Sequence, residues 1–136
     1  MDLDKAREFV RANNRAVMTT RRADGSPQLS PVVVGVGQAG RLRRSTRETA
    51  IKTKNLRRDP RVSFCVISDG FFGPWVQVAG TAEIVSLPDA MELLVDYYRD
   101  ISGEHPDWDD YRAAMEREKR VMVLVDVERA GPDVSG

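Results

Sequence analysis

The alternation between apolar and polar residues changes its period several times along the chain, and these changes predict the order of strands and helices. A period near two is typical of a strand, whereas apolar residues three or four apart indicate one face of a helix. Strands are predicted over residues 15–22, 27–36, 42–46, 62–67, 75–85 and 121–127. Helices are predicted over residues 1–13, 50–58, 89–101 and 107–119, with a polar tail over 130–136. Hairpin connections between the strands favour a mainly β, α+β fold, a six-stranded antiparallel barrel with peripheral helices.

The second predicted strand indicates how the barrel is covered. Residues 23–26 form a Gly-containing turn that joins the first two strands into a hairpin. From Pro31 to Val36 the strand is apolar on both faces. Such a strand is buried on both sides, so we expect it under other elements or at a contact between subunits. With 136 residues and no break in composition, the chain is predicted to form one domain, 1–136.

Charge is distributed unevenly along the chain. The segment from Arg41 to Arg61 holds nine Lys or Arg and two acids, a net charge of +7, so the remaining residues carry −7 because the total is zero. A basic segment within an acidic protein often binds phosphate or another polyanion. The alternative is a solvated basic helix face.

The basic segment contains the start of the helix predicted over 50–58. Thr49 is the expected N-cap, which places Lys52 at the third helical position. Free backbone N–H groups and the positive end of the helix dipole favour an anion there. Lys52 adds a full charge, so the helix start is a candidate anion site.

Composition excludes several kinds of chemistry. Hydrophobic residues make up 41% of the chain and charged residues 31%, which is typical of soluble globular proteins, and no apolar run approaches the roughly 20 residues that span a bilayer. One cysteine, Cys65, and one histidine, His105, allow no intrachain disulfide and no His/Cys metal cluster, so no metal site is predicted. Cys65 has the setting of a core residue, and His105 lies in an acidic turn rather than a catalytic triad. The N-terminus lacks the apolar core of a signal peptide, so a cytoplasmic location is expected.

Several strings of residues resemble a known family. Ser45-Thr46, Lys52, Asn55-Leu56 and Asp59-Pro60-Arg61-Val62 resemble the signature of flavin-binding split β-barrel proteins related to pyridoxamine 5′-phosphate oxidase. The run from Gly103 to Arg112, GEHPDWDDYR, and the turn Asp24-Gly25-Ser26-Pro27-Gln28 resemble an actinobacterial branch that uses the deazaflavin coenzyme F420. The resemblance covers nearly the whole chain and implies a homodimer with cofactor at the subunit interface.

The resemblance also implies roles for individual residues. Lys52, Ser45 and Thr46 would hold the cofactor phosphate, and Asn55 belongs to the same motif. Two strand segments would border the ring of the cofactor, and their residues are Pro27, Gln28, Leu29 and Ser30 in one and Trp75, Val76, Gln77 and Val78 in the other. Members of the family often have an arginine shortly before the lysine, where this chain has Ala50 and Ile51. Arg43, Arg44 or Arg47 would then have to supply that charge, and Lys54, Arg57 and Arg58 are candidates for neutralising the polyglutamate tail of F420.

The resemblance implies an F420-dependent oxidoreductase that transfers a hydride from reduced deazaflavin to an electron-poor small molecule such as an enone or quinone. No acid/base constellation is evident, and Tyr97, Tyr98 and Tyr111 are either proton donors or packing aromatics. The alternatives are an FMN-dependent oxidoreductase on the same scaffold and a carrier or binding protein that does not turn over. Nucleic-acid binding is not expected because residues 41–61 contain no aromatic residue on which bases stack.

Four further aromatic residues have more than one interpretation. Trp75 either borders the cofactor or packs in the core, and Trp108 is a lid element, a dimer contact or a packing residue. Phe71 and Phe72 are either core residues or part of a loop that lines the substrate cavity.

Overall fold

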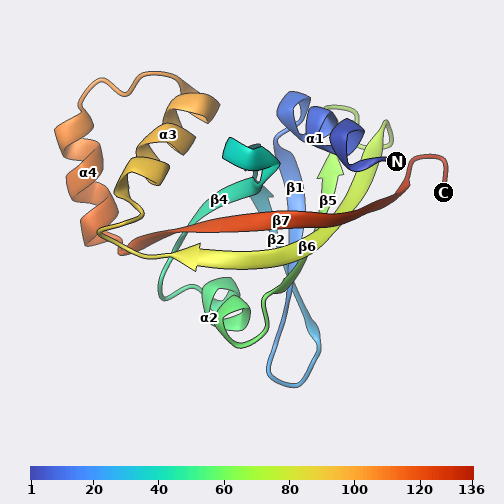
Figure 1. Ribbon diagram of the computed structural model, residues 1–136, viewed down its shortest axis with the longest axis horizontal. Helices are drawn as coiled ribbons and strands as arrows, with labels where there is room; N and C mark the ends of the chain where they lie inside the picture. Colours follow the sequence, from blue (N-terminus) through green and yellow to red (C-terminus); the bar gives the residue numbers. More distant parts are fainter.

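A seven-stranded antiparallel sheet forms the centre of the structure, a computed structural model that describes all 136 residues. Its strands are β1 (Arg15–Arg21), β2 (Pro27–Val33), β3 (Gly35–Val36), β4 (Leu42–Arg47), β5 (Arg61–Ile67), β6 (Trp75–Val85) and β7 (Arg120–Asp133). They lie in the spatial order β2-β1-β5-β6-β7-β4-β3, so β2 and β3 are the edge strands. The sheet curls into a half-barrel around the long strands β6 and β7 (Figure 1).

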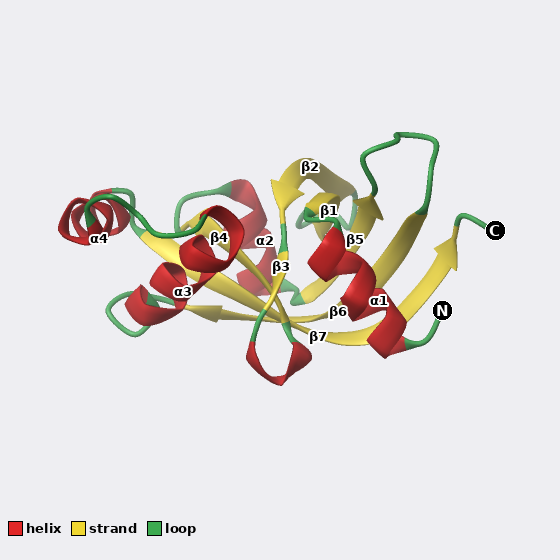
Figure 2. Cartoon of the chain, turned by 90° about the horizontal axis from the view of Figure 1, so that it is seen from above, coloured by secondary structure: helices red, strands yellow, loops and turns green.

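Four α-helices surround the sheet: α1 (Leu3–Ala12), α2 (Ile51–Arg58), α3 (Met91–Ser102) and α4 (Trp108–Arg117). Helices α3 and α4 lie at one end of the sheet, and α1 lies toward the other end, near both termini (Figure 2). Asp2 caps α1, because its side chain accepts a hydrogen bond from the Lys5 amide. Asp107 caps α4 in the same way and accepts a hydrogen bond from the Asp110 amide. None of the helices combines the length and the apolar character needed to cross a membrane.

Two hydrophobic clusters stabilise the fold. The larger one fills the barrel, where inward-facing residues of β1, β5, β6 and β7 meet α1, and Met18, Phe64 and Val76 are almost fully buried there. The smaller one lies under α3 and α4 and includes Leu94 and Met122. Successive residues of β7 serve both clusters: Met122 and Leu124 face the helices, whereas Val123 and Val125 face the barrel.

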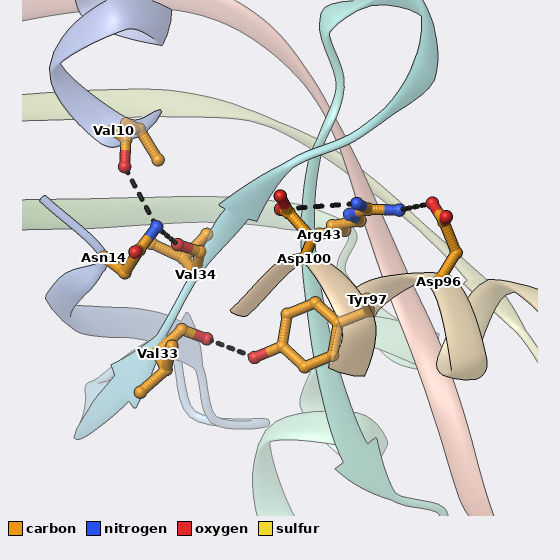
Figure 3. Close-up of polar contacts among 8 residues, drawn as sticks. All are labelled: Val10, Asn14, Val33, Val34, Arg43, Asp96, Tyr97 and Asp100. Carbon is orange, nitrogen blue, oxygen red and sulfur yellow. Dashed lines mark hydrogen bonds and ion pairs between the residues drawn. The ribbon is translucent and has the colours of Figure 1, made fainter. Parts of the chain in front are cut away.

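The structure corrects several predicted boundaries. The sheet has seven strands rather than six, because the second predicted strand is interrupted at Val34 into β2 and β3. At this interruption the Val34 amide donates to the Asn14 carbonyl. The Asn14 side-chain amide donates to the backbone carbonyls of Val10 and Val34 (Figure 3). The predicted polar tail is partly wrong, because β7 continues to Asp133. Backbone pairing with the long strand β6 extends β7 regardless of side-chain polarity.

The predicted cap of α2 is also wrong. Ala50, not Thr49, is the N-cap, and no side chain caps this end, so Lys52 is the second helical residue rather than the third. The hydroxyl of Thr53 donates to the Arg47 carbonyl at 2.6 Å and fixes the turn that leads from β4 into α2. The amides at the start of α2 therefore have no side-chain partner within the chain.

Candidate anion and cofactor site

Lys52 lies at the start of α2 and points toward the edge strand β2. Its ammonium Nζ is 3.5 Å from the Ser30 hydroxyl, and no carboxylate pairs with it. Partial burial lowers the pKa of Lys52, and the positive charges of Arg44 and Arg120 lower it further. Arg44 and Arg120 thus lie near enough to Lys52 to act on its charge, and a bound anion would offset this repulsion.

Arg44, on β4, is the second cation of this group and also has no carboxylate partner. One of its Nη atoms lies 3.4 Å from both the Val33 carbonyl and the Tyr97 hydroxyl, and its Nε is buried without a hydrogen-bond partner. A guanidinium held only by neutral groups keeps its charge available to a ligand. We refer to Lys52, Ser30, Arg44, Ser45 and Arg120 as the Lys52 site.

Two cavities meet at Arg44. One, of about 410 Å³, is mainly apolar and is lined by Val17, Pro31, Val33 and Ile67 together with Arg44. The other, of about 370 Å³, is lined by Arg44, Ser45 and Arg120 and by the aromatic rings of Tyr97, Tyr98 and Tyr111. An apolar space next to a cationic one suits a molecule with a flat aromatic part and an anionic part.

Strand β2 borders this region with a free edge. It pairs only with β1, from Arg21 opposite Pro27 to Arg15 opposite Val33, so its other side carries unpaired backbone groups. Pro27 and Leu29 project outward and are exposed, whereas Ser30 lies beside Lys52. Gln28 bonds within the strand region, accepting from Thr20 and donating to the Leu29 carbonyl. Side chains already donate to the carbonyls of Pro27, Leu29 and Val33, and the two prolines of the strand have no N–H. The edge therefore has only a few free backbone groups for a ligand's ring.

Several residues of the expected cofactor set lie inside the protein. Val76 and Val78 belong to the barrel core, whereas Trp75 and Gln77 on the same strand are only partly buried and face the other side. Thr46 is buried on β4, while Ser45 lines the tyrosine cavity. Asn55 is buried, donates to Thr20 and accepts from Arg58, so its amide links α2 to β1.

The cations further along α2 have a different setting from Lys52. Arg57 pairs with Glu48 at 2.7 Å, and Arg58 donates to the Arg21 carbonyl and to Asn55. Lys54 is exposed and lies about 200° around the helix from Lys52, because each residue turns the helix by about 100°. These cations therefore lie apart from Lys52 on the helix, and their contact with a cofactor tail stays a prediction.

Most aromatic residues of α3, α4 and the loop between them pack against one another or hydrogen-bond to the backbone. Tyr97 donates to the Val33 carbonyl (Figure 3) and Tyr111 to the Leu94 carbonyl, each at 2.9 Å. Burial raises the pKa of Tyr111 to about 12. Tyr98, Trp108 and His105 pack against one another and against Tyr111 with ring centroids 5.0–5.8 Å apart. Phe71 and Phe72, in contrast, are exposed by 72% and 93%.

Arg120 is the member of the site that the sequence did not indicate. The antiparallel pairing of β4 with β7 brings Arg120 to the site, because Arg47 lies opposite Arg120 and Ser45 lies opposite Met122. Its guanidinium also pairs with Glu118 at 2.8 Å. Arg120 is 68 positions from Lys52 in the chain, and no spacing rule connects positions that only a long strand pairing brings together.

Comparison with known proteins gives a family match over most of the chain. The sequence profile of the family described as Pyridoxamine 5′-phosphate oxidase matches residues 3–131. Among solved structures, the conserved hypothetical protein Rv2991 from Mycobacterium tuberculosis is similar, with 29% identity and a TM-score of 0.76 over 96% of this chain and 82% of that one.

Two other similar structures have names that mention a ligand. A protein named F420 reductase has 21% identity and a TM-score of 0.70 over 91% of this chain and 94% of that one. HutZ, a heme storage protein from Vibrio cholerae, has 17% identity and a TM-score of 0.72 over 98% of this chain and 96% of that one. At these identities the likeness shows the fold, which is the split barrel of the family.

Proposed function

Because the chain belongs to the pyridoxamine 5′-phosphate oxidase family, we propose that it is an F420-dependent reductase that transfers a hydride from reduced deazaflavin to an electron-poor small molecule. The observation that carries the proposal is the Lys52 site, in which Lys52 and Arg44 have no carboxylate partner and Arg44 also lines an apolar cavity at the free edge of β2. The resemblance of the Gly103–Arg112 run and the neighbour named F420 reductase favour deazaflavin over FMN.

The residues of the Lys52 site fit the phosphate of such a cofactor. Lys52 and Arg44 supply charge, and the hydroxyls of Ser30 and Ser45 supply hydrogen bonds. The unpaired backbone of β2 and the apolar wall of Val17, Pro31 and Ile67 suit a flat ring with polar edges. Arg44 takes the place of the arginine that the family often has shortly before the lysine.

When bound, a reduced deazaflavin supplies a hydride to one carbon of the acceptor's double bond, while the other carbon takes a proton from water. The chain positions the two reactants and excludes water from their contact. Its buried tyrosines, Tyr97 and Tyr111, already donate their protons to backbone carbonyls. Proton delivery is therefore assigned to solvent rather than to these two tyrosines.

A second copy of the chain would complete the site. On β2, β1 and β5 the neighbouring residues Pro31, Val17 and Cys65 lie side by side on the outer face, and none is buried. Leu29 on the same face is 58% exposed. An apolar sheet face of this kind is typical of an interface between subunits, so we propose that a homodimer covers it.

The test is a titration of the purified protein with F420 and with FMN, followed by the same titrations on Lys52→Ala. Loss of a partly buried lysine that holds a phosphate weakens binding by about 1.5–3 kcal/mol, roughly tenfold to hundredfold. Lys54→Ala is the matched control, because Lys54 is an exposed lysine on the opposite side of the same helix. Equal effects of the two substitutions would contradict the proposed site.

An assay of cofactor oxidation then distinguishes an F420-dependent reductase, an FMN-dependent enzyme and a carrier protein. Oxidation of reduced F420 in the presence of an enone or quinone supports the reductase. Tight FMN binding with a yellow purified protein would favour the FMN-dependent alternative. Cofactor binding without oxidation by any acceptor would leave a carrier protein as the function.

A further inference from the structure

A second group of cations lies on the outer face of the sheet, beside the patch that the proposed homodimer would cover, since Thr19 of this region lies opposite Leu29. A cavity of about 530 Å³ crosses β1, β5, β6 and β7, and its walls include Arg21, Arg61 and Arg129. An adjoining cavity of about 430 Å³ shares Arg21 and Arg61 and adds Arg22 and Arg58. We refer to these two connected cavities as the arginine trough.

Small residues form the floor of the trough. Thr19, Ser63 and Ala79 lie in one row across three strands, since Thr19 is opposite Ser63 and Ser63 is opposite Ala79. The row continues to Arg129 on β7. At its other end the row reaches Leu29 on β2, opposite Thr19. Arg21 and Arg61 line the cavity from the neighbouring row, so the short side chains lie between longer ones.

A bulge in β7 places two charged residues in the trough. Ala79 lies opposite Arg129, but the next residue, Gly80, lies opposite Val127, so Glu128 is an extra residue in β7. Glu128 and Arg129 consequently both line the cavity. Gly80 permits this arrangement, because a Cβ there would lie 2.0 Å from the Asp126 carbonyl oxygen.

The trough has an excess of positive charge. Five arginines face only two acids, Asp59 and Glu128. Asp59 is committed to Arg61 at 2.7 Å, and Glu128 accepts a hydrogen bond from Thr81. Arg21, Arg22, Arg58 and Arg129 form no ion pair. Guanidinium groups without carboxylates are suited to a carboxylate or phosphate from outside the chain.

The trough continues from both strand segments that are expected to border the cofactor. Pro27, at the start of β2, lines it, and Ala79 on β6 lies two residues after Gln77 and on the same face of the strand. We propose that the arginine trough binds an acidic group of the hydride acceptor, so that the preferred acceptors are electron-poor molecules that carry a carboxylate or phosphate. This inference rests on the proposed function and names the substrate class of the same site.

The acidic group has two possible sources, the acceptor or the tail of the cofactor. Both are anionic, so the experiment uses probes that separate them. For the acceptor we choose 3-benzoylacrylate and its neutral amide, which share the same electron-poor double bond. For binding without reaction we choose the saturated acid, 3-benzoylpropanoate.

The variants are Arg129→Gln and Arg21→Gln, with Arg11→Gln as the matched control. Arg11 is an exposed arginine of α1 that forms no ion pair and lies outside the trough. Calorimetric titration with 3-benzoylpropanoate is expected to show binding that weakens about threefold to tenfold in each trough variant and with added salt, but not in Arg11→Gln. With reduced F420, the trough variants are expected to raise the KM for the acid and to leave the KM for the amide unchanged.

The outcomes distinguish this inference from the proposed function. Failure of F420 and FMN to bind would overturn the function, whereas the calorimetric titration still tests the trough by itself. Equal KM values for the acid and the amide, or equal effects of Arg11→Gln and Arg129→Gln, would overturn the trough. A loss of F420 affinity in Arg129→Gln that grows with tail length would assign the trough to the cofactor tail and overturn it as an acceptor site.

Discussion

Arg43 and Arg44 are neighbours on β4 with opposite surroundings. Arg43 is 7% exposed and pairs with Asp96 at 2.6 Å and Asp100 at 3.4 Å on α3 (Figure 3). Arg44 projects to the other side of the strand, where only a carbonyl and a hydroxyl meet it. Both have a buried Nε without a partner, so this atom does not distinguish them. The difference lies in the carboxylates. Asp96 and Asp100 pair with Arg43 and so link β4 to α3, whereas Arg44 has no carboxylate partner and is free to pair with a ligand.

The same contrast separates other cations of the basic segment. Arg57 is neutralised by Glu48, whereas Lys52 has only a hydroxyl at 3.5 Å. A dense run of positive charge in the sequence is therefore divided by the fold into cations held in ion pairs and the unpaired cations of the proposed cofactor site. Each prediction below changes one side of this contrast.

The largest effect is expected from Asp96→Asn combined with Asp100→Asn. The double substitution leaves the buried Arg43 cation without a counter-charge and is expected to lower the free energy of unfolding by about 3 kcal/mol, at the low end of the range for breaking buried pairs. The low end applies because the two carboxylates are 56% and 49% exposed. Urea denaturation measures the change.

Glu92→Gln is the control for this measurement. Glu92 is on the same helix, and its pairing with Arg112 is on the surface, so the substitution is expected to have little effect. Unchanged stability of the double variant would show that Arg43 does not hold α3 against the sheet.

Arg44→Gln is expected to act on binding instead of stability. Loss of the guanidinium removes a charge-assisted contact to the proposed phosphate and weakens F420 affinity by about 2 kcal/mol, roughly thirtyfold. The free energy of unfolding should change by less than about 1 kcal/mol, because only hydrogen bonds to neutral groups are lost. Fluorescence titration and denaturation on the same sample compare the two quantities. A variant that unfolds easily but binds normally would reverse the roles of Arg43 and Arg44.

The smallest effect concerns the pH dependence of binding. The pKa of Lys52 is lowered by burial and by Arg44 and Arg120, so its positive charge is lost at a lower pH than that of an ordinary lysine. Cofactor affinity should therefore fall as the pH rises through this lowered pKa, by less than the loss caused by Lys52→Ala. Lys52→Arg should remove that part of the decrease, since a guanidinium stays protonated.

Titrations from pH 7 to pH 10 on wild type, Lys52→Arg and Lys54→Ala measure this effect. Ionisation of the ligand affects all three proteins equally, so only the difference between them reports Lys52. Identical pH profiles would mean that the ammonium group does not touch the bound anion.

The sequence by itself determined the kinds and order of the elements. Alternation of apolar residues predicted β1, β5 and β6 closely, and apolar residues three or four apart predicted α1 and α4 to within two residues at each end. The cluster of charge around Lys52, together with the family motif, pointed to the start of α2 as a candidate anion site. These features are local, because side-chain periodicity and helix capping depend on residues within a few positions of one another.

The tertiary structure alone decided which cations have partners. Asp96 and Asp100 lie more than 50 residues from Arg43, and Arg120 reaches the Lys52 site only through the pairing of β4 with β7. The bulge at Glu128 and the row of small residues that form the arginine trough also depend on strand register. Register and long-range ion pairs arise when distant segments pack together, and no local pattern in the chain encodes where those segments meet.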